Sequence, residues 1–200
     1  MDKDKVLNKI YDYIDDHRDD MLKILKEYIN FRSVNTEQVL GGETTEMVAC
    51  QQWVSQELEK TDYFSKVDYN EKAKGRPNVV GVRKGNGNGR SLHFNAHTDV
   101  VTVSQEQAAQ WSMLSPFDGG VKDGKAWGRG ASDMKAVGTA MLHAAKTLAA
   151  HDVQLKADLL LSFVNGEESG RADISVFILL DRGYTSDFSI MAKPTNPEHI

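Results

Sequence analysis

The hydrophobic positions follow a helical period in four parts of the chain. From residue 4 to residue 31, most apolar side chains stand three or four positions apart among Lys, Asp and Glu. This spacing predicts one long or broken amphipathic helix. The same period predicts helices over residues 45–58, 133–150 and 174–180.

Between these helices the pattern changes to short segments rich in β-branched and aromatic residues, which are typical of strands. They cover residues 64–69, 78–83, 91–96, 157–164 and 187–191. The segment 157–164 is apolar almost throughout, as expected for a strand covered on both faces. Strands that alternate with helices after an initial hairpin predict an α/β fold, a three-layer mixed sheet with helices on both faces.

A glycine-rich segment, residues 84–90, separates the strands 78–83 and 91–96. Its Asn-Gly pairs predict a hairpin turn that joins these two strands. A phosphate-binding loop is the alternative interpretation, but such a loop opens a helix and carries Gly-Lys-Ser/Thr. Here a strand follows, and Lys84 precedes the glycines. A plain turn is therefore favoured.

Composition narrows the class of protein. A length of 200 residues suits one domain, or one and a half, and the net charge of −5 argues against binding to nucleic acid or to an anionic membrane. Cys50 is the one cysteine, so an intrachain disulfide is excluded and the reducing cytoplasm fits best. The charged N-terminus does not look like a signal peptide, and no apolar run approaches the roughly 18 residues of a membrane span.

Acidic residues and one histidine stand at the ends of two predicted strands and at the start of one predicted helix. His97 and Asp99 come at the end of the strand 91–96, Asp133 lies in a glycine-rich loop at a helix start, and Glu167 and Glu168 follow the strand 157–164. Asp133 could instead cap its helix, and the two glutamates could lie in a solvated loop. Sites in such sheets form beyond the carboxyl ends of strands, however, so we expect these side chains to meet at one edge.

Histidine together with carboxylates is a donor set that suits Zn²⁺, with Co²⁺ or Mn²⁺ as possible substitutes. A dinuclear hydrolytic site needs one carboxylate that bridges both ions and further nitrogen or oxygen ligands on each. It also needs a carboxylate that is not a ligand, to take the proton from water. The acidic residues at this edge are numerous enough to supply both roles.

The order and spacing of several motifs resemble one family over essentially the whole chain. The matching blocks are residues 94–101, Trp111 with 115–117, 123–124 leading to 128–135, 167–170 and 194–196. They are similar to the M20 family of zinc metallopeptidases and deacylases, which includes acetylornithine deacetylase, succinyl-diaminopimelate desuccinylase and aminoacylase-1. The resemblance implies hydrolysis of a small-molecule N-acyl amino acid or a short peptide, with an acetylornithine deacetylase-like activity as the first expectation.

The resemblance also implies a role for each site residue. His97 would bind one zinc, with Asp99 orienting it, and Asp133 would bridge two zinc ions. In this family the peptide bond after that aspartate is often cis. Glu167 would be the general base that takes a proton from water, and Glu168 would bind the second zinc.

One residue departs from the family pattern. The family has an acidic zinc ligand before Pro-Thr, and here that position is Lys193, followed by Pro194 and Thr195. An ammonium group does not bind a metal ion and repels a dication. His199 is near in sequence but follows the proline turn, which makes it a less suitable ligand.

Family members are roughly twice as long as this chain. We therefore expect residues 1–200 to be the N-terminal portion of a zinc-exopeptidase-like catalytic domain that is incomplete at its C-terminus. The lid and dimerisation domain and the C-terminal catalytic segment would be absent, which leaves the oligomeric state open. The leading hypothesis is a zinc-dependent amide hydrolase whose fragment is inactive or weak. The alternative is a non-catalytic or truncated relic that keeps the fold but not a complete metal site.

Overall fold

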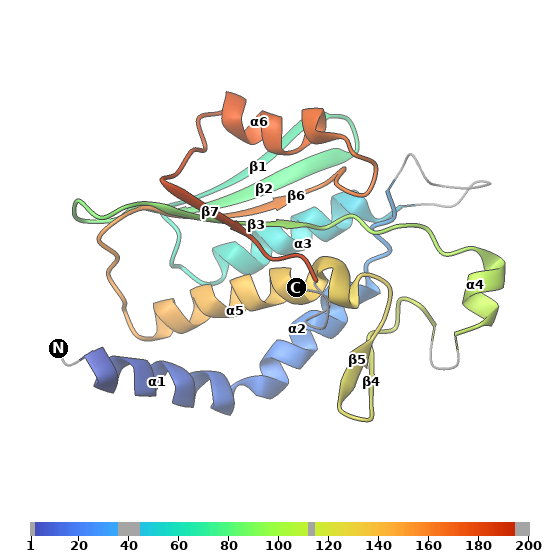
Figure 1. The fold of residues 1–200 in the computed structure, drawn as a ribbon, viewed down its shortest axis with the longest axis horizontal. Helices are drawn as coiled ribbons and strands as arrows, with labels where there is room; N and C mark the ends of the chain where they lie inside the picture. Colours follow the sequence, from blue (N-terminus) through green and yellow to red (C-terminus); the bar gives the residue numbers. More distant parts are fainter. Residues whose placement is uncertain (1–2, 36–44, 112–114, 195–200) are drawn as a thin grey trace.

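The computed structural model describes residues 3–35, 45–111 and 115–194 (Figure 1). The helices are α1 (Lys3–Asp16), α2 (Arg18–Asn30), α3 (Met47–Glu59), α4 (Gln105–Ala109), α5 (Ala136–Ala150) and α6 (Val176–Asp181), with the short turns η2 (Ala131–Lys135) and η3 (Ala172–Ile174). The strands are β1 (Lys66–Ala73), β2 (Arg76–Arg83), β3 (Leu92–His97), β4 (Gly120–Lys122), β5 (Lys125–Trp127), β6 (Leu159–Val164) and β7 (Phe188–Met191). Within these ranges no helix is both long enough and apolar enough to cross a bilayer.

Five strands form the main sheet in the order β1-β2-β6-β3-β7. The β1 and β2 strands form the hairpin, closed at Lys74 and Gly75, and β6 runs antiparallel to β2. The β3 strand is parallel to both β6 and β7. The sheet is therefore mixed, as the sequence predicts, and the carboxyl ends of three parallel strands lie at one edge.

The hairpin predicted at residues 84–90 is wrong, because β6 lies between the two strands that this segment connects. The segment crosses the start of β6, where Asn86 and Gly87 donate backbone hydrogen bonds to the carbonyls of Leu155 and Lys156. A side chain at Gly85 would place its Cβ 2.4 Å from the backbone of Ala157. The glycine is needed for this close crossing of two backbones rather than for a tight turn.

Helices cover both faces of the sheet, which confirms the three-layer α/β fold. The larger core lies between the sheet and α2, α3 and α5, where Tyr28, Leu58, Leu142 and Phe163 are fully buried. On the opposite face, α6 packs Leu179 against strands β2 and β6. Every residue of β6 is buried, as its continuous apolar sequence predicts.

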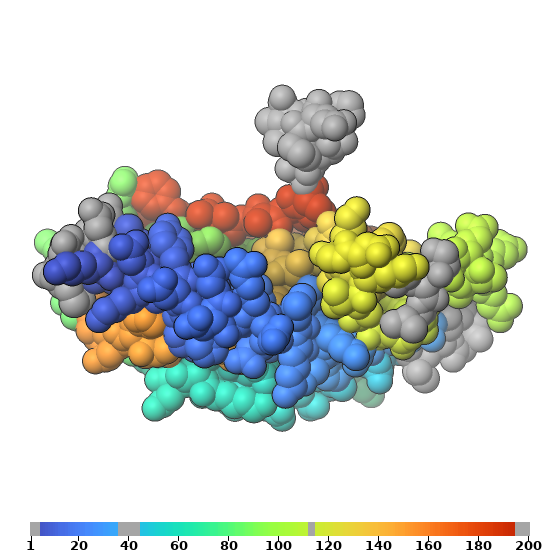
Figure 2. Space-filling view, turned by 90° about the horizontal axis from the view of Figure 1, so that it is seen from below, coloured from blue at the N-terminus to red at the C-terminus, as the bar shows by residue number. Residues whose placement is uncertain are grey.

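The predicted first helix is broken at His17 into α1 and α2. His17 ends the first of these with a contact of 2.8 Å between its Nδ1 and the carbonyl of Tyr13. Both helices contact α5. In the view from below, α1 and α2 (blue) lie over the outer surface of the helical layer (Figure 2).

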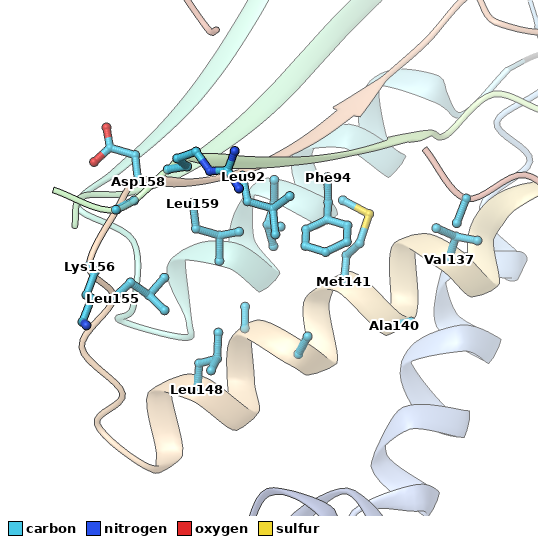
Figure 3. Close-up of a pocket in the computed structure, with 17 residues that line it drawn as sticks. Leu92, Phe94, Val137, Ala140, Met141, Leu148, Leu155, Lys156, Asp158 and Leu159 are labelled. Carbon is cyan, nitrogen blue, oxygen red and sulfur yellow. The ribbon is translucent and has the colours of Figure 1, made fainter. Parts of the chain in front are cut away.

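An apolar groove of about 590 Å³ lies between α5 and the strands β3 and β6 of the sheet (Figure 3). Phe94 from β3 and Met141 and Leu148 from α5 are among its lining residues. All four residues of β7, at the edge of the sheet, are exposed. His97 and the acidic residues singled out above do not line the groove.

Candidate metal centre

The register of the parallel strands brings the predicted site residues to one edge of the sheet. His97 ends β3 and pairs with Val164, the last residue of β6, so the loop that carries the two glutamates begins beside it. Asn95 pairs with Met191 of β7, so the chain that follows β7 runs past His97 toward Lys193. The predicted meeting of these residues at a carboxyl edge is therefore observed.

Three donor atoms at this edge lie within 4.8 Å of one another. They belong to His97, Asp133 and Glu168, and the histidine is buried while the two carboxylates are partly exposed. Ligand distances for zinc are about 2 Å, so small rotations of these side chains would bring all three onto one ion. The described residues thus fit a divalent metal ion.

The ring of His97 is held by the backbone of residue 99. Its Nδ1 lies 2.9 Å from the carbonyl oxygen of Asp99 and 3.6 Å from the carboxylate of the same residue. A carbonyl only accepts hydrogen bonds, so we assign the ring hydrogen to Nδ1. Nε2 then carries the lone pair of the ring, and it can accept a hydrogen bond from Lys193 Nζ at 3.0 Å. Asp133 Oδ1 also lies 3.0 Å from Nε2, but both atoms are then acceptors.

The carboxylate of Asp99 is fully buried and holds the loop that carries the two glutamates. Its oxygens accept hydrogen bonds from the backbone N–H groups of Glu167 and Glu168, at 3.4 and 3.0 Å. The amide of Asn35 donates to the same carboxylate at 2.8 Å and to Ser169 Oγ at 3.1 Å. Sequence reasoning missed Asn35, because a polar residue just after a predicted helix gives no signal of a partner 64 positions away.

Asp133 lies in the irregular turn η2, and its peptide bond to Met134 is cis, as the family resemblance implies. Its carboxylate approaches His97 Nε2 at 3.0 Å and accepts a hydrogen bond from Lys193 at 2.7 Å. No side chain caps α5, so the interpretation of Asp133 as a helix cap is wrong. Burial acts to raise the pKa of Asp133, whereas the ammonium of Lys193 acts to lower it, and the pKa is lowered overall.

A buried lysine anchors the same turn to the helix beneath it. Lys135 is fully buried, and its ammonium donates to the carbonyl oxygens of Tyr28 and Phe31 at 2.9 and 2.7 Å. These carbonyls belong to the end of α2, where backbone acceptors have no partner within the helix. Burial lowers the pKa of Lys135 to about 8. This contact fixes η2, and with it Asp133, relative to α2.

The two glutamates lie in the loop that follows β6. Glu167 has one oxygen 3.6 Å from His97 Nε2 and the other 3.1 Å from Lys193 Nζ. Burial raises the pKa of Glu168, and the negative charges of Asp133 and Glu167 act in the same direction against the effect of His97. Several carboxylates thus share a small volume, an arrangement that favours a cation.

The structure places the side chain of Lys193 inside this group. Its Nζ lies 3.0 Å from His97 Nε2, 2.7 Å from Asp133 and 3.1 Å from Glu167. Burial acts to lower the pKa of Lys193, but the carboxylates of Asp133 and Glu167 outweigh it and the pKa is raised. Thr195 and Asn196 of the matching motif, and His199, lie outside the described residues.

Comparisons with known proteins point to one family. The model of the peptidase family M20/M25/M40 matches residues 93–200. The chain is 30% identical over 204 residues to the N-formyl-4-amino-5-aminomethyl-2-methylpyrimidine deformylase of Bacillus subtilis (strain 168), covering 98% of this chain and 43% of that protein. It is 35% identical over 130 residues to a succinyl-diaminopimelate desuccinylase of Cereibacter sphaeroides (strain ATCC 17029 / ATH 2.4.9), covering 63% and 33%.

Among solved structures, human carnosine dipeptidase 1 superimposes with a TM-score of 0.78 at 19% identity, over 96% of this chain and 42% of the dipeptidase. At that identity the likeness shows a shared fold. The chain spans less than half the length of these relatives. The family model covers more than half of the chain and includes every candidate site residue from His97 to Lys193. The chain therefore belongs to the M20/M25/M40 peptidase family.

Proposed function

We propose that this chain forms the metal-binding part of an amide hydrolase that removes a small acyl group from an amine. The observation that carries the proposal is the meeting of donor atoms from His97, Asp133 and Glu168 with a fourth group, Glu167, beside them. The names of two relatives support the reaction class, since one describes removal of a formyl group and the other of a succinyl group. We expect N-formyl and N-succinyl amines to be better first substrates than long peptides.

The donor set favours zinc, with cobalt or manganese as substitutes. A divalent ion bound here would polarise the substrate carbonyl and lower the pKa of a water molecule. His97 would hold the ion through Nε2, and Asp133 and Glu168 would supply oxygen ligands. The described residues offer a ligand set for one ion, and a second zinc remains a prediction from the family resemblance.

Glu167 would receive a proton from water. Its carboxylate lies close to His97 Nε2 without belonging to the three-residue donor group, and it is partly exposed, so water can reach it. Asp99 holds the backbone of Glu167 and so keeps this carboxylate in position. A carboxylate that contacts the water but does not bind the ion is the general base such hydrolysis needs.

Replacing Glu167 by Gln should separate catalysis from metal binding. In the complete gene product we expect Glu167→Gln to lower kcat by about 10²–10⁴-fold, the usual contribution of a general base. Zinc content, measured by mass spectrometry of the purified protein, should stay at the wild-type value. The conservative Glu167→Asp variant should recover part of the activity. Loss of zinc together with activity would show that Glu167 is a ligand rather than the base.

The alternative is a chain that keeps the fold but has lost a complete metal site. The contact of Lys193 with His97 and Asp133 favours this alternative. Titration of zinc into the metal-free protein separates the two functions, with Lys193→Glu as comparison. If neither protein binds zinc at micromolar concentrations, the hydrolase proposal is wrong.

A further inference from the structure

The ammonium group of Lys193 contacts two of the three groups that would hold a metal ion. We propose that Lys193 is a tethered cation that occupies the metal position between His97 and Asp133, so that a divalent ion binds only when this side chain leaves. The proposal rests on the proposed function, because it concerns the ligands of the same site. It makes Lys193 a competitor of the metal within the chain.

The competition arises because Nε2 of His97 can bind only one partner, either the ammonium group or a metal ion. With the ring hydrogen on Nδ1, Nε2 has a single lone pair. That lone pair faces Lys193 Nζ at 3.0 Å, and a metal ion would need the same lone pair. The ammonium and a metal ion therefore cannot both bind His97.

The charge of Lys193 reduces the electrostatic repulsion between the carboxylates of the candidate site. Its ammonium lies between the carboxylates of Asp133 and Glu167, at 2.7 and 3.1 Å, and offsets their mutual repulsion. Removing this charge without adding a metal ion would leave the carboxylates facing one another. Lys193 should therefore stabilise the metal-free chain while it weakens metal binding.

The side chain also has a route out of the site. It is 34% exposed and lies just beyond the exposed edge strand β7. Its flexible four-carbon stem can turn the ammonium into solvent without moving the sheet. Exclusion of the metal is then reversible, and metal affinity is set by how readily Lys193 gives up its three contacts.

The test compares Lys193→Met with the wild-type chain by two measurements. The first is the dissociation constant for zinc, from competition with a chromophoric chelator, and the second is the melting temperature in excess EDTA. We expect zinc binding to tighten at least tenfold in Lys193→Met and further in Lys193→Glu, which adds a carboxylate ligand. In EDTA the melting temperature of Lys193→Met should fall. Lys125→Met, which removes an exposed lysine from β5, should change neither value.

The outcomes distinguish this inference from the proposed function. An unchanged zinc affinity together with an unchanged melting temperature in EDTA would overturn the inference, even if zinc binds and the hydrolase proposal stands. No zinc binding by any variant would overturn both the inference and the hydrolase proposal, whatever the melting temperature in EDTA. Lys193→Gln, which keeps a polar end group, replaces the methionine variant if that variant aggregates.

Discussion

At the scale of single residues, Asp99 performs two separate tasks at the candidate site. Its backbone carbonyl fixes the hydrogen of His97 on Nδ1, and its carboxylate holds the backbone of Glu167 and Glu168. The side chain of Asp99 therefore acts mainly on the glutamate loop, and only at 3.6 Å on the histidine ring. Partners behind the ligands of a metal site commonly tune its affinity in this way.

Replacing Asp99 by Asn should loosen the glutamate loop without removing a ligand. The carboxylate of Asp99 carries a buried charge, and its two oxygens accept hydrogen bonds from two backbone N–H groups. Asparagine loses this charge and keeps one acceptor oxygen, because its amide nitrogen cannot accept a hydrogen bond. We expect zinc affinity to fall about 10–100-fold, and the free energy of unfolding to fall by about 1–3 kcal/mol. Isothermal titration with zinc and urea unfolding measure the two effects. Unchanged zinc affinity would mean that the carboxylate of Asp99 does not position Glu168.

The sequence indicated the candidate ligands better than the residues that hold them in position. Histidine and acidic residues after predicted strands carry a chemical signal, and the alternation of strands and helices shows where those strands end. The amide of Asn35 and the ammonium of Lys135 carry no such signal, because their partners are distant in the chain or are backbone carbonyls. The position of Lys193 could be predicted from the motif, but its contacts with Asp133 and Glu167 depend on the register of β7.

At the scale of elements, a nearly buried ion pair joins two helices of the same layer. Glu57 of α3 accepts hydrogen bonds from Lys146 of α5 at 3.1 Å and from Lys60 at 2.6 Å, and its side chain is 7% exposed. Burial acts to raise the pKa of Glu57, but the two lysines outweigh it and the pKa is lowered. The ionised form is therefore favoured in the folded chain.

Replacing Glu57 by Gln should destabilise the chain in a pH-dependent way. A carboxyl group whose pKa is lowered by folding contributes stability above its unfolded pKa, and this stability is lost as pH falls through the folded pKa. We expect Glu57→Gln to reduce the free energy of unfolding by about 1–3 kcal/mol at pH 7. The difference should shrink as the pH falls below the ordinary glutamate value of 4.5. Urea unfolding of both proteins across this range checks the trend, which a constant difference would contradict.

Sequence patterns predicted the strands of the main sheet but not which strands are neighbours. The period of apolar residues indicates which faces of a strand are buried. That burial pattern is the same whether residues 84–90 form a turn or cross another strand, so it does not reveal which strands pair. The short helix α4 was also missed, although Ser104 and Gln107 form a capping box that is readable from the sequence. The small hairpin of β4 and β5 has only three residues in each strand, too few for a period to show.

At the scale of the whole molecule, the described part of the chain presents an apolar groove and an exposed edge strand, β7. The groove lies beside α5, and Phe188, Ile190 and Met191 of β7 are each more than 40% exposed. Exposed apolar surface of this kind binds other apolar groups. The candidate metal centre lies outside the groove, so the two regions can be tested separately.

We expect the groove to bind the dye 8-anilinonaphthalene-1-sulfonate with an increase in fluorescence. Ala144 lines the groove and is exposed, so Ala144→Glu places a charge there without disturbing the core. The variant should lose at least half of the fluorescence gain, while its free energy of unfolding changes by no more than about 0.5 kcal/mol. Ala150→Glu, at the exposed end of the same helix and outside the groove, is the matched control. Equal fluorescence of all three proteins would place the dye elsewhere.

The position of β6 between β2 and β3 also determines when the sheet can form during synthesis. Both neighbours are translated well before β6, and neither has its inner partner until residues 159–164 have left the ribosome. At about 5–20 residues per second, that delay lasts several seconds. During it the inner edges of β2 and β3 are open to strands of other chains. We therefore expect the growing chain, before β6 appears, to be the form of this protein that most needs a chaperone.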